Sequence, residues 1–292
     1  MDFEIVTDSC CNLVEDMIDD FGLHILPLTF MVDGEDAVYQ SYLKGEKTDL
    51  KQFYTMMREG KVFKTSLPNL AESEALFRSI LDKGHDLIYL AFSSGLSGTF
   101  QALSLMCSQL QEEYPDRKIY AVDTLAASGG QGLLVWYAVQ HARAGETIDQ
   151  VRDWVEENKL HLAHWFTVDD LMFLFRGGRV SKTAAWAGTL LNIKPVLHVD
   201  NEGHLIPMEK VRGRKKSLNA LVDHMEKSAV QPISDQMVFI THGDCLEEAE
   251  YVAEKVKERF GVKDVIINYI DPVIGSHAGP GTMALFFLAD QR

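Results

Sequence analysis

The fold is decided by one stretch of the sequence, DLIYLAFSSGLSGT at residues 86–99. Its first seven residues are a short apolar run rich in β-formers, which predicts a buried strand and not a helix. Serines and glycines follow at once, and a helical pattern then runs from about Thr99 to Glu113. A strand that passes through a short polar turn into a helix is typical of a parallel α/β sheet.

The same alternation extends through the rest of the first half. Further strands are predicted at FEIVT (3–7), HILPLTF (24–30) and KIYAV (118–122). Asn12 and Glu15 form a capping box that predicts a helix ending at Gly22. Asn69 predicts the cap of another helix, which ends at Gly84. Two more helices are predicted at 48–59 and 130–144. Strands and helices that alternate at this spacing indicate βαβ units.

The second half changes character. KPVLHV (194–199) and HLIPMEKV (204–211) flank Asp200–Gly203, which predicts an antiparallel hairpin. Other strands are expected at HLAHWFTV (161–168), QMVFIT (236–241) and DVIINYI (264–270), with helices at Thr147–Lys159, Lys216–Ser228, Glu247–Phe260 and, at the end, Thr282–Leu288. This mixture indicates an α+β domain. We therefore predict an α/β domain over 1–160 and an α+β domain over 161–292.

Composition narrows the class of protein. The chain has 292 residues, 46% of them hydrophobic, and carries a formal net charge of −15. Such an acidic chain is not expected to bind nucleic acid, because the phosphates of nucleic acid bind to surfaces dense in Lys and Arg. No apolar run is long enough to span a membrane, and the N-terminus lacks the basic region of a secretory signal. We expect a cytoplasmic protein without stable membrane insertion, whose four cysteines are reduced thiols.

The charge is unevenly distributed. Between Leu171 and Lys216 nine basic residues face three acidic ones, so this stretch carries +6 and the remainder −21. Such a reversal is either a docking surface for an anion or acidic partner, or simply a solvated basic face.

Small polar residues follow several of the predicted strands. They are Asp8-Ser9, Ser93-Ser94-Gly95, Asp123-Thr124, His242-Gly243-Asp244 and Gly275-Ser276-His277. Each could simply cap the next helix. Because ligands of open α/β sheets bind beyond the carboxyl ends of the strands, five such loops favour a shared site.

The most informative loop is SSGLSGT at 93–99. Hydroxyls and N–H groups at the start of a helix attract a carboxylate or phosphate. The loop lacks the G-x-S-x-G of a nucleophile elbow, because Thr99 occupies the closing position, and it has no GK[ST] of a phosphate-binding loop. It therefore predicts an anion cradle that includes Ser93, Ser94 and Gly95.

Two further segments offer polar groups. TSLPN (65–69) presents Thr65 before a proline, and GSHAGPG (275–281) surrounds His277 with glycines that let a ligand approach. A metal site is not expected, because neither His161 with His164 nor His242 with Asp244 and Cys245 supplies three convincing ligands.

Taken in order, these segments resemble the DegV family over nearly the whole chain. The matching motifs are IVTDSCCNL, TSLPN, SSGLSGTF, DTLAASGGQG, LMFLFRGGRVS, Lys194-Pro195 and GSHAGPG. The chain departs mildly from the family pattern at Cys10, Leu67, Phe175 and Gly243. Phe175 stands where a basic residue often precedes the Arg-Gly-Gly-Arg motif, so it weakens the basic character there.

The resemblance implies one unit over about 3–288, with a Rossmann-like first domain, an α+β second domain and a fatty acid such as palmitate between them. It implies a non-catalytic, lipid-binding subunit of bacterial fatty-acid kinase, whose ATP-dependent partner phosphorylates the carboxylate. An acyltransferase of phospholipid synthesis would then use the product. By the same resemblance, Thr65, Ser93, Ser94 and His277 would contact the carboxylate, with Gly95 beside them. The positions near the acyl head or facing the kinase would be Arg176, Arg179, Arg212, Arg214 and Lys215.

Two other functions remain open. One is a hydrolase or phosphoryl-transfer enzyme that uses a serine of 93–97 with His277 and Asp8 or Asp123. The other is a regulatory module in which the lipid only stabilises the fold.

Overall fold

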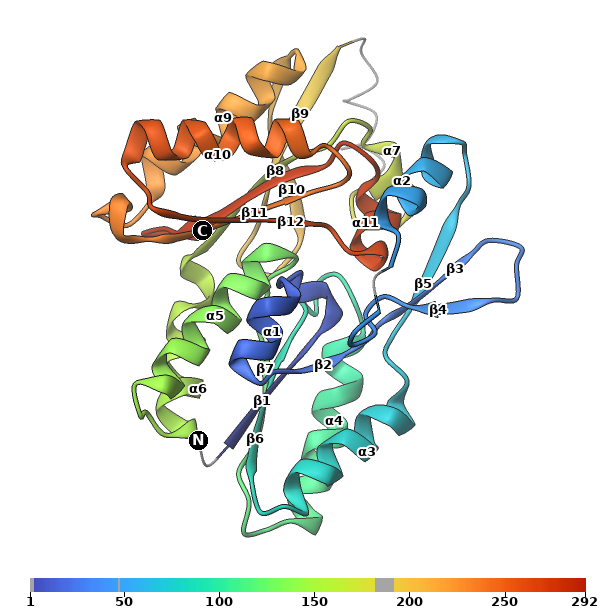
Figure 1. Cartoon of the computed structure of the whole chain (residues 1–292), viewed down its shortest axis with the longest axis vertical. Coiled ribbons are helices and arrows are strands. Elements are labelled where there is room, and N and C mark those ends of the chain that lie inside the picture. The colour runs from blue at the N-terminus through green and yellow to red at the C-terminus, as the bar shows by residue number, and fades with distance from the viewer. Residues whose placement is uncertain (1–2, 47, 182–191) are drawn as a thin grey trace.

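The computed structural model describes residues 3–46, 48–181 and 192–292 (Figure 1). It confirms the predicted fold class, because a parallel sheet is followed along the chain by a second, mixed sheet. The two sheets are called the N-terminal sheet and the C-terminal sheet below. Within the described residues, no helix is both long and apolar enough to cross a bilayer.

The N-terminal sheet has four parallel strands in the order β2-β1-β6-β7. Side chains of the central strand β6 alternate between two cores: Leu87 and Tyr89 face one, and Ile88 and Leu90 the other. Helices α3 and α4 cover the first face, and α1, α5 and α6 cover the second. The strands are β1 (Phe3–Asp8), β2 (His24–Leu26), β6 (Asp86–Ala91) and β7 (Ile119–Asp123). The helices are α1 (Glu15–Phe21), α3 (Leu70–Leu81), α4 (Thr99–Glu113), α5 (Gly129–Arg143) and α6 (Ile148–Asn158).

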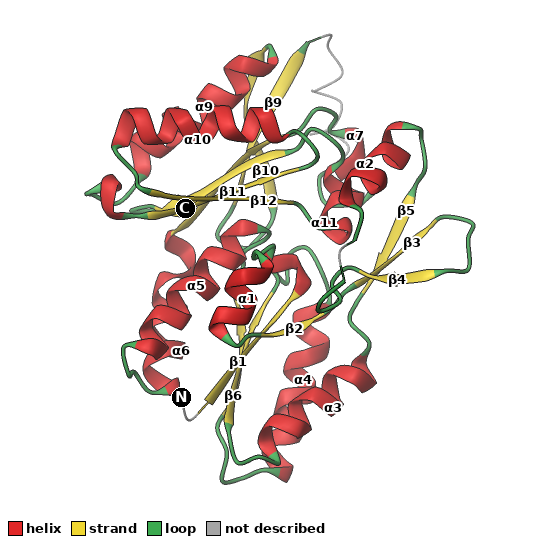
Figure 2. Ribbon diagram, viewed as in Figure 1, coloured by secondary structure: helices red, strands yellow, loops and turns green. Residues whose placement is uncertain are grey.

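The C-terminal sheet has six strands in the order β10-β9-β8-β13-β11-β12, and only β11 and β12 are parallel. Helices α9 and α10 cover its outer face, whereas its inner face packs on α5 (Figure 2). Helix α5 therefore lies between the two sheets. The strands are β8 (Leu162–Thr167), β9 (Ile193–Val199), β10 (Leu205–Arg212), β11 (Met237–His242), β12 (Asp264–Tyr269) and β13 (Met283–Leu288). The helices are α9 (Arg214–Ser228) and α10 (Leu246–Phe260).

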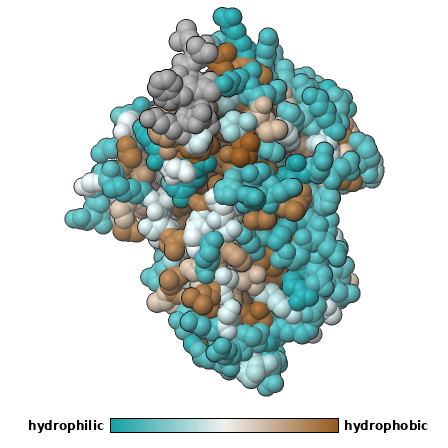
Figure 3. Space-filling model, turned by 180° about the vertical axis from the view of Figure 1, so that it is seen from behind, coloured by the Kyte–Doolittle hydropathy of each residue, from teal (hydrophilic) through white to brown (hydrophobic). Residues whose placement is uncertain are grey.

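A small antiparallel sheet projects from the side of the molecule (Figure 1). It has the order β4-β3-β5 and packs on α2, with Phe30, Phe53 and Phe63 in mutual ring contact. Its strands are β3 (Thr29–Val32), β4 (Val38–Gln40) and β5 (Phe63–Ser66), and the helix is α2 (Leu50–Arg58). Short helices complete the fold, namely η1 (Ser9–Cys11), η2 (Lys159–His161), α7 (Met172–Arg176), η3 (Ile233–Asp235) and α11 (Pro272–Ala278). The rear surface is largely hydrophilic, with apolar residues gathered in its central part (Figure 3).

Four local predictions are wrong for physical reasons. Residues 283–288 form strand β13 and not a helix, because this run is buried on both faces between β8 and β11. Residues 24–30 form two strands in different sheets, since Pro27 cannot donate a ladder hydrogen bond. Asn12 does not cap the start of α1: it ends η1 with a left-handed backbone (φ 49°), and α1 starts after Val14 without a side-chain cap.

The fourth error concerns His277, which was expected in a loop. Residues Pro272–Ala278 form α11, whose N-cap Asp271 accepts hydrogen bonds from the backbone N–H groups of Val273 (3.2 Å) and Ile274 (3.1 Å). An Asp followed by Pro is a helix-start signal, because the missing N–H of proline costs nothing at the first helical position. Helix α11 therefore fixes the position of His277.

Candidate functional site

Three of the five polar segments singled out in the sequence lie at the carboxyl edge of the N-terminal sheet, whereas residues 242–244 and 275–277 belong to the C-terminal half. Asp8 at the end of β1 accepts hydrogen bonds from the N–H of Phe92 (2.8 Å) and the hydroxyl of Tyr89 (3.0 Å). Asp123 at the end of β7 accepts one from the N–H of Ser94 (3.1 Å). These carboxylates hold the 92–98 loop in place.

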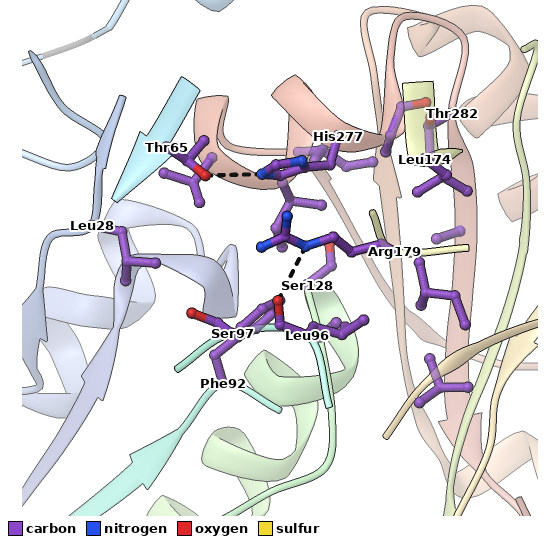
Figure 4. A pocket seen from close by; sticks show the side chains of 18 of the residues that line it. Leu28, Thr65, Phe92, Leu96, Ser97, Ser128, Leu174, Arg179, His277 and Thr282 are labelled. Carbon is purple, nitrogen blue, oxygen red and sulfur yellow. Dashed lines mark hydrogen bonds between the residues drawn. The ribbon is translucent and has the colours of Figure 1, made fainter. Parts of the chain in front are cut away.

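A pocket of about 400 Å³ lies beyond this edge, between the two sheets. Small-molecule sites commonly measure about 300–1,000 Å³. Its described lining is mostly aliphatic and aromatic, and three of its polar side chains, Thr65, Arg179 and His277, lie close together and form a polar region (Figure 4). Both halves of the chain contribute apolar residues to it, among them Leu28, Phe92, Leu96, Phe166, Leu174, Val199, Leu205, Ile270, Val273, Ile274 and Phe286.

Thr65 and His277 meet at the polar region of the pocket. Oγ1 of Thr65, on β5, lies 2.9 Å from Nε2 of His277, on α11, and the ring tautomer decides which atom donates. Both side chains line the cavity (Figure 4). Two residues that are 212 positions apart are thus brought together.

Arg179 supplies the positive charge of the pocket and lies next to this pair (Figure 4). Its Nε donates to the carbonyl oxygen of Leu96 (3.1 Å), and its Nη1 donates to that of Gly177. Burial, followed by the positive charge of Arg179, lowers the pKa of His277 to about 4. The imidazole is therefore neutral at pH 7, and among the described lining residues Arg179 is the group that can neutralise an anion.

Gly177 makes the approach of His277 possible. A Cβ at this position would lie 2.3 Å from Nδ1 of His277, which is far inside van der Waals contact. The first glycine of the Arg-Gly-Gly-Arg motif is therefore required by packing against the imidazole. Its backbone also holds Arg179, so one residue orients both polar groups.

Three other polar side chains of the described lining bond to the protein itself. Ser128 donates to Oδ1 of Asn12 (2.7 Å), and Nε2 of His164 accepts from the N–H of Ala127 (3.2 Å). The hydroxyl of Thr282 donates to the carbonyl oxygens of Ala278 and Gly279. Because these atoms are already paired, they leave few free hydrogen-bonding groups for a ligand.

The predicted site residues fall into separate groups. Thr65, His277 and Arg179 line the pocket together, whereas Ser93, Ser94 and Gly95 are outside its described lining. Ser93 instead donates to the carbonyl oxygen of Gly203 (2.9 Å) in the β9–β10 turn.

The predicted cations also differ in their exposure and their bonding partners. Arg176 is exposed and its guanidinium lies over the ring of Phe173, 4.7 Å from the centroid. Arg212 and Lys215 are exposed, but Arg214 bonds to Glu248 and to the carbonyl oxygen of Gly281. Lys182 of the basic stretch lies outside the described residues.

Five polar residues of the described lining were not predicted as site residues, namely Ser66, Ser97, Ser128, His164 and Thr282. Ser66 and Ser97 belong to motifs already singled out, but the strand and turn geometry that points them at the cavity cannot be read from residue type. No group of three potential metal ligands occurs within the described residues. Nδ1 of His242 accepts from the N–H of Cys245 (3.2 Å), and Asp244 bonds to Arg58 and to the hydroxyl of Tyr269.

Comparison with known proteins identifies the family. A family model described as "Uncharacterised protein, DegV family" matches residues 2–290. The chain belongs to the DegV family. A DegV domain-containing protein of Clostridium perfringens is 46% identical over 290 residues, which cover 99% of this chain and 98% of the relative. One from Streptococcus pyogenes is 37% identical over 288 residues, again covering 99% and 98%.

Solved DegV structures share the whole fold. A DegV lipid-binding protein from Thermotoga maritima superposes with a TM-score of 0.85 at 28% identity and covers 100% of both chains. A DegV family protein from Thermus thermophilus, described by its fatty-acid binding, gives 0.85 at 28% and covers 99% of this chain and 100% of that one. DegV from Bacillus subtilis, described as a fatty-acid-binding protein, gives 0.83 at 28% with the same coverage.

Proposed function

We propose that this protein binds one long-chain fatty acid in the pocket, as its DegV relatives of known structure do. The observation that carries the proposal is the pairing of a largely apolar cavity with a polar region that contains Arg179, Thr65 and His277. Fatty acids have this same division into a long apolar chain and a single anionic end. The ligand would lie with its tail among the aliphatic and aromatic side chains.

The tail supplies most of the binding free energy. Each buried methylene contributes about 0.8 kcal/mol, so a tail of about sixteen carbons yields roughly 13 kcal/mol before the costs of ordering. A buried carboxylate, in contrast, is costly unless it is paired. Arg179 offers charge-assisted hydrogen bonds, and the hydroxyl of Thr65 and the imidazole of His277 satisfy the remaining lone pairs. Ser97 contributes a further hydroxyl to the lining of the same pocket.

We further propose that the protein is a non-catalytic subunit in the cytoplasm. It would present the carboxylate to a separate ATP-dependent kinase subunit, which forms an acyl phosphate for a downstream acyltransferase of phospholipid synthesis. The exposed cations of the basic stretch, Arg176, Arg212 and Lys215, are the candidate contacts for that kinase.

The geometry gives little support to a serine hydrolase. Ser93 donates to the carbonyl of Gly203, and the hydroxyl of Ser97 lies 2.9 Å from that of Thr99. Nε2 of His277 pairs with Thr65, so no serine of 93–97 hydrogen-bonds to this histidine within the described chain. A nucleophile needs its base within hydrogen-bond reach.

Native mass spectrometry of freshly purified protein tests the binding proposal. We expect a retained species with the mass of one fatty acid, and recovery of the same complex when delipidated protein is titrated with palmitate. The matched variant Arg179→Gln should retain the fold but bind about tenfold or more weakly, because a hydrogen bond to a charged group is lost. Unchanged affinity would remove Arg179 from the site.

The kinase role is tested separately. Loaded protein, ATP and a purified fatty-acid kinase subunit should yield acyl phosphate, and omission of the kinase subunit should abolish it. If the protein bound lipid but no acyl phosphate formed with the kinase subunit present, the result would contradict the kinase role and support a regulatory module. Turnover of acyl esters by the protein alone would indicate an enzyme.

A further inference from the structure

The turn between β9 and β10 lies directly on the 93–95 loop of the other half of the chain. Ser93 is fully buried, and its hydroxyl donates to the carbonyl oxygen of Gly203 at 2.9 Å. Gly95 packs so closely on this turn that an added Cβ would lie 2.8 Å from the carbonyl oxygen of Glu202. Gly203 is equally constrained, since its own Cβ would be 2.1 Å from Oγ of Ser93.

The turn is itself well defined. Oδ1 of Asp200 accepts hydrogen bonds from the N–H groups of Glu202 and His204, both at 2.9 Å. The guanidinium of Arg292 ties the turn to the neighbouring 124–128 loop, since Nη1 donates to the carbonyl oxygens of Leu125 (2.7 Å) and Asp200 (3.0 Å). The turn thus behaves as a rigid unit with two attachments.

The residues on either side of the turn form part of the pocket wall. Val199, at the end of β9, and Leu205, at the start of β10, both line the cavity, where Phe92 and Leu96 of the other half also lie. Val199 and Leu205 directly flank the turn, so a displacement of the turn from the 93–95 loop would carry these two side chains with it.

We infer that Ser93 is a positioning residue that holds the β9–β10 turn closed over the bound acyl chain, and that it does not contact the carboxylate. Gly95 and Gly203 serve the same contact by allowing the two backbones to approach. The inference rests on the proposed fatty-acid ligand, but it assigns Ser93 a role different from that expected by resemblance.

Binding kinetics distinguish the two roles. A residue that grips the carboxylate stabilises only the complex, so its loss raises the dissociation rate and leaves the association rate unchanged. A residue that closes the pocket affects free and loaded protein alike. Its loss increases the fraction of open protein, so association and dissociation accelerate together and the affinity changes little.

Stopped-flow fluorescence with cis-parinaric acid measures both rates on delipidated protein. For Ser93→Ala we expect both rates to rise by roughly three- to tenfold, the effect of losing one neutral hydrogen bond. Asp200→Ala, which loosens the turn without touching the other half, should act in the same direction. Thr65→Val should raise only the dissociation rate, and Asn201→Ala, an exposed change in the same turn, should alter neither rate.

Hydrogen–deuterium exchange gives a readout that needs no ligand. The amides of residues 199–205 should exchange faster in Ser93→Ala than in wild type, and at the wild-type rate in Asn201→Ala. A rise in dissociation alone, or unchanged exchange in Ser93→Ala, would overturn the inference. Failure of wild-type protein to bind the probe would instead overturn the proposed function, while the exchange measurement would still test the role of Ser93.

Discussion

Arg214 on α9 forms an ion pair with Glu248 on α10: its Nε donates to Oε2 at 2.9 Å. The same guanidinium reaches the carbonyl oxygen of Gly281, in the segment between α11 and β13. Its side chain is only 17% exposed. Arg214 therefore joins three segments of the C-terminal half and is not a free cation for a partner, although it stands in a basic stretch.

Stability measurements should separate Arg214 from its basic neighbours. Arg214→Met leaves Glu248 and a carbonyl unpaired, so we expect a loss of about 2 kcal/mol in the free energy of unfolding. Arg212→Glu, at an exposed position, should change it by less than about 0.5 kcal/mol. Urea titration followed by circular dichroism measures both. Equal effects would mean that the ion pair contributes nothing.

Charge reversal at the surface should affect the proposed kinase step alone. Arg212→Glu with Lys215→Glu should slow acyl-phosphate formation by the kinase subunit at low salt, because steering between opposite charges is lost. Palmitate affinity should be that of wild type. A parallel loss of lipid affinity would place these residues at the pocket instead.

Fatty-acid affinity should increase as the pH falls toward 5. Burial and Arg179 lower the pKa of His277 to about 4 in the free protein. A bound carboxylate stabilises the imidazolium and raises this pKa, so binding takes up a proton and is favoured by acid between the two values. Equilibrium titrations from about pH 7.5 to 5 should show the trend in wild type, and His277→Gln should remove it. Any slope that persists in the variant belongs to the ligand or to other groups.

Gly177→Ala should displace His277 without altering any polar group. The new Cβ would lie 2.3 Å from Nδ1, so the imidazole must move away from Thr65. We expect palmitate to bind several-fold more weakly. Gly98→Ala is the matched control, because Gly98 also lines the pocket but its Cβ would meet nothing within 4 Å. If both variants bound like wild type, the position of His277 would not matter.

Asp8→Asn should destabilise the protein and change how its stability depends on pH. Burial raises the pKa of Asp8 to about 6, despite four hydrogen bonds to its carboxylate. A raised pKa means that ionisation disfavours the folded state, so this group makes stability fall as the pH rises from about 4 to 6. The variant should lack that component, but it should be less stable at pH 7 by about 2 kcal/mol, because its NH₂ group faces a donor. Urea titrations at several pH values provide the test.

Local signals in the sequence predict much of the fold. Asn69 does cap α3, accepting from the N–H groups of Ala71 and Glu72, and α4 spans Thr99–Glu113 as expected. The β9–β10 hairpin forms around Asp200. The predictions for these elements are correct because capping, turn chemistry and apolar periodicity agree within a few residues. The helix predicted over residues 282–288 is wrong because an apolar run that is buried on both faces has no hydrophobic period that distinguishes a strand from a helix.

The site was predictable only in part. Motif resemblance singled out Thr65 and His277, and the structure brings them together, but nothing local to either residue indicates the other. The sequence also marked the 93–99 loop as an anion cradle, yet which serine faces the cavity depends on the turn from the other half that covers Ser93. Of the three serines in this loop, Ser97 is the one that lines the pocket. Such choices are made by tertiary contacts and not by residue type.

The pocket walls come from both halves of the chain, so a bound acyl chain would serve as shared hydrophobic core. The resistance of the protein to heat and proteases should then rise with the concentration of free fatty acid. Each tenfold rise in free fatty acid above the dissociation constant adds about 1.4 kcal/mol to the free energy of unfolding. Cells starved of fatty acid would hold a looser, shorter-lived form of the protein, so its abundance would follow the pool from which it draws.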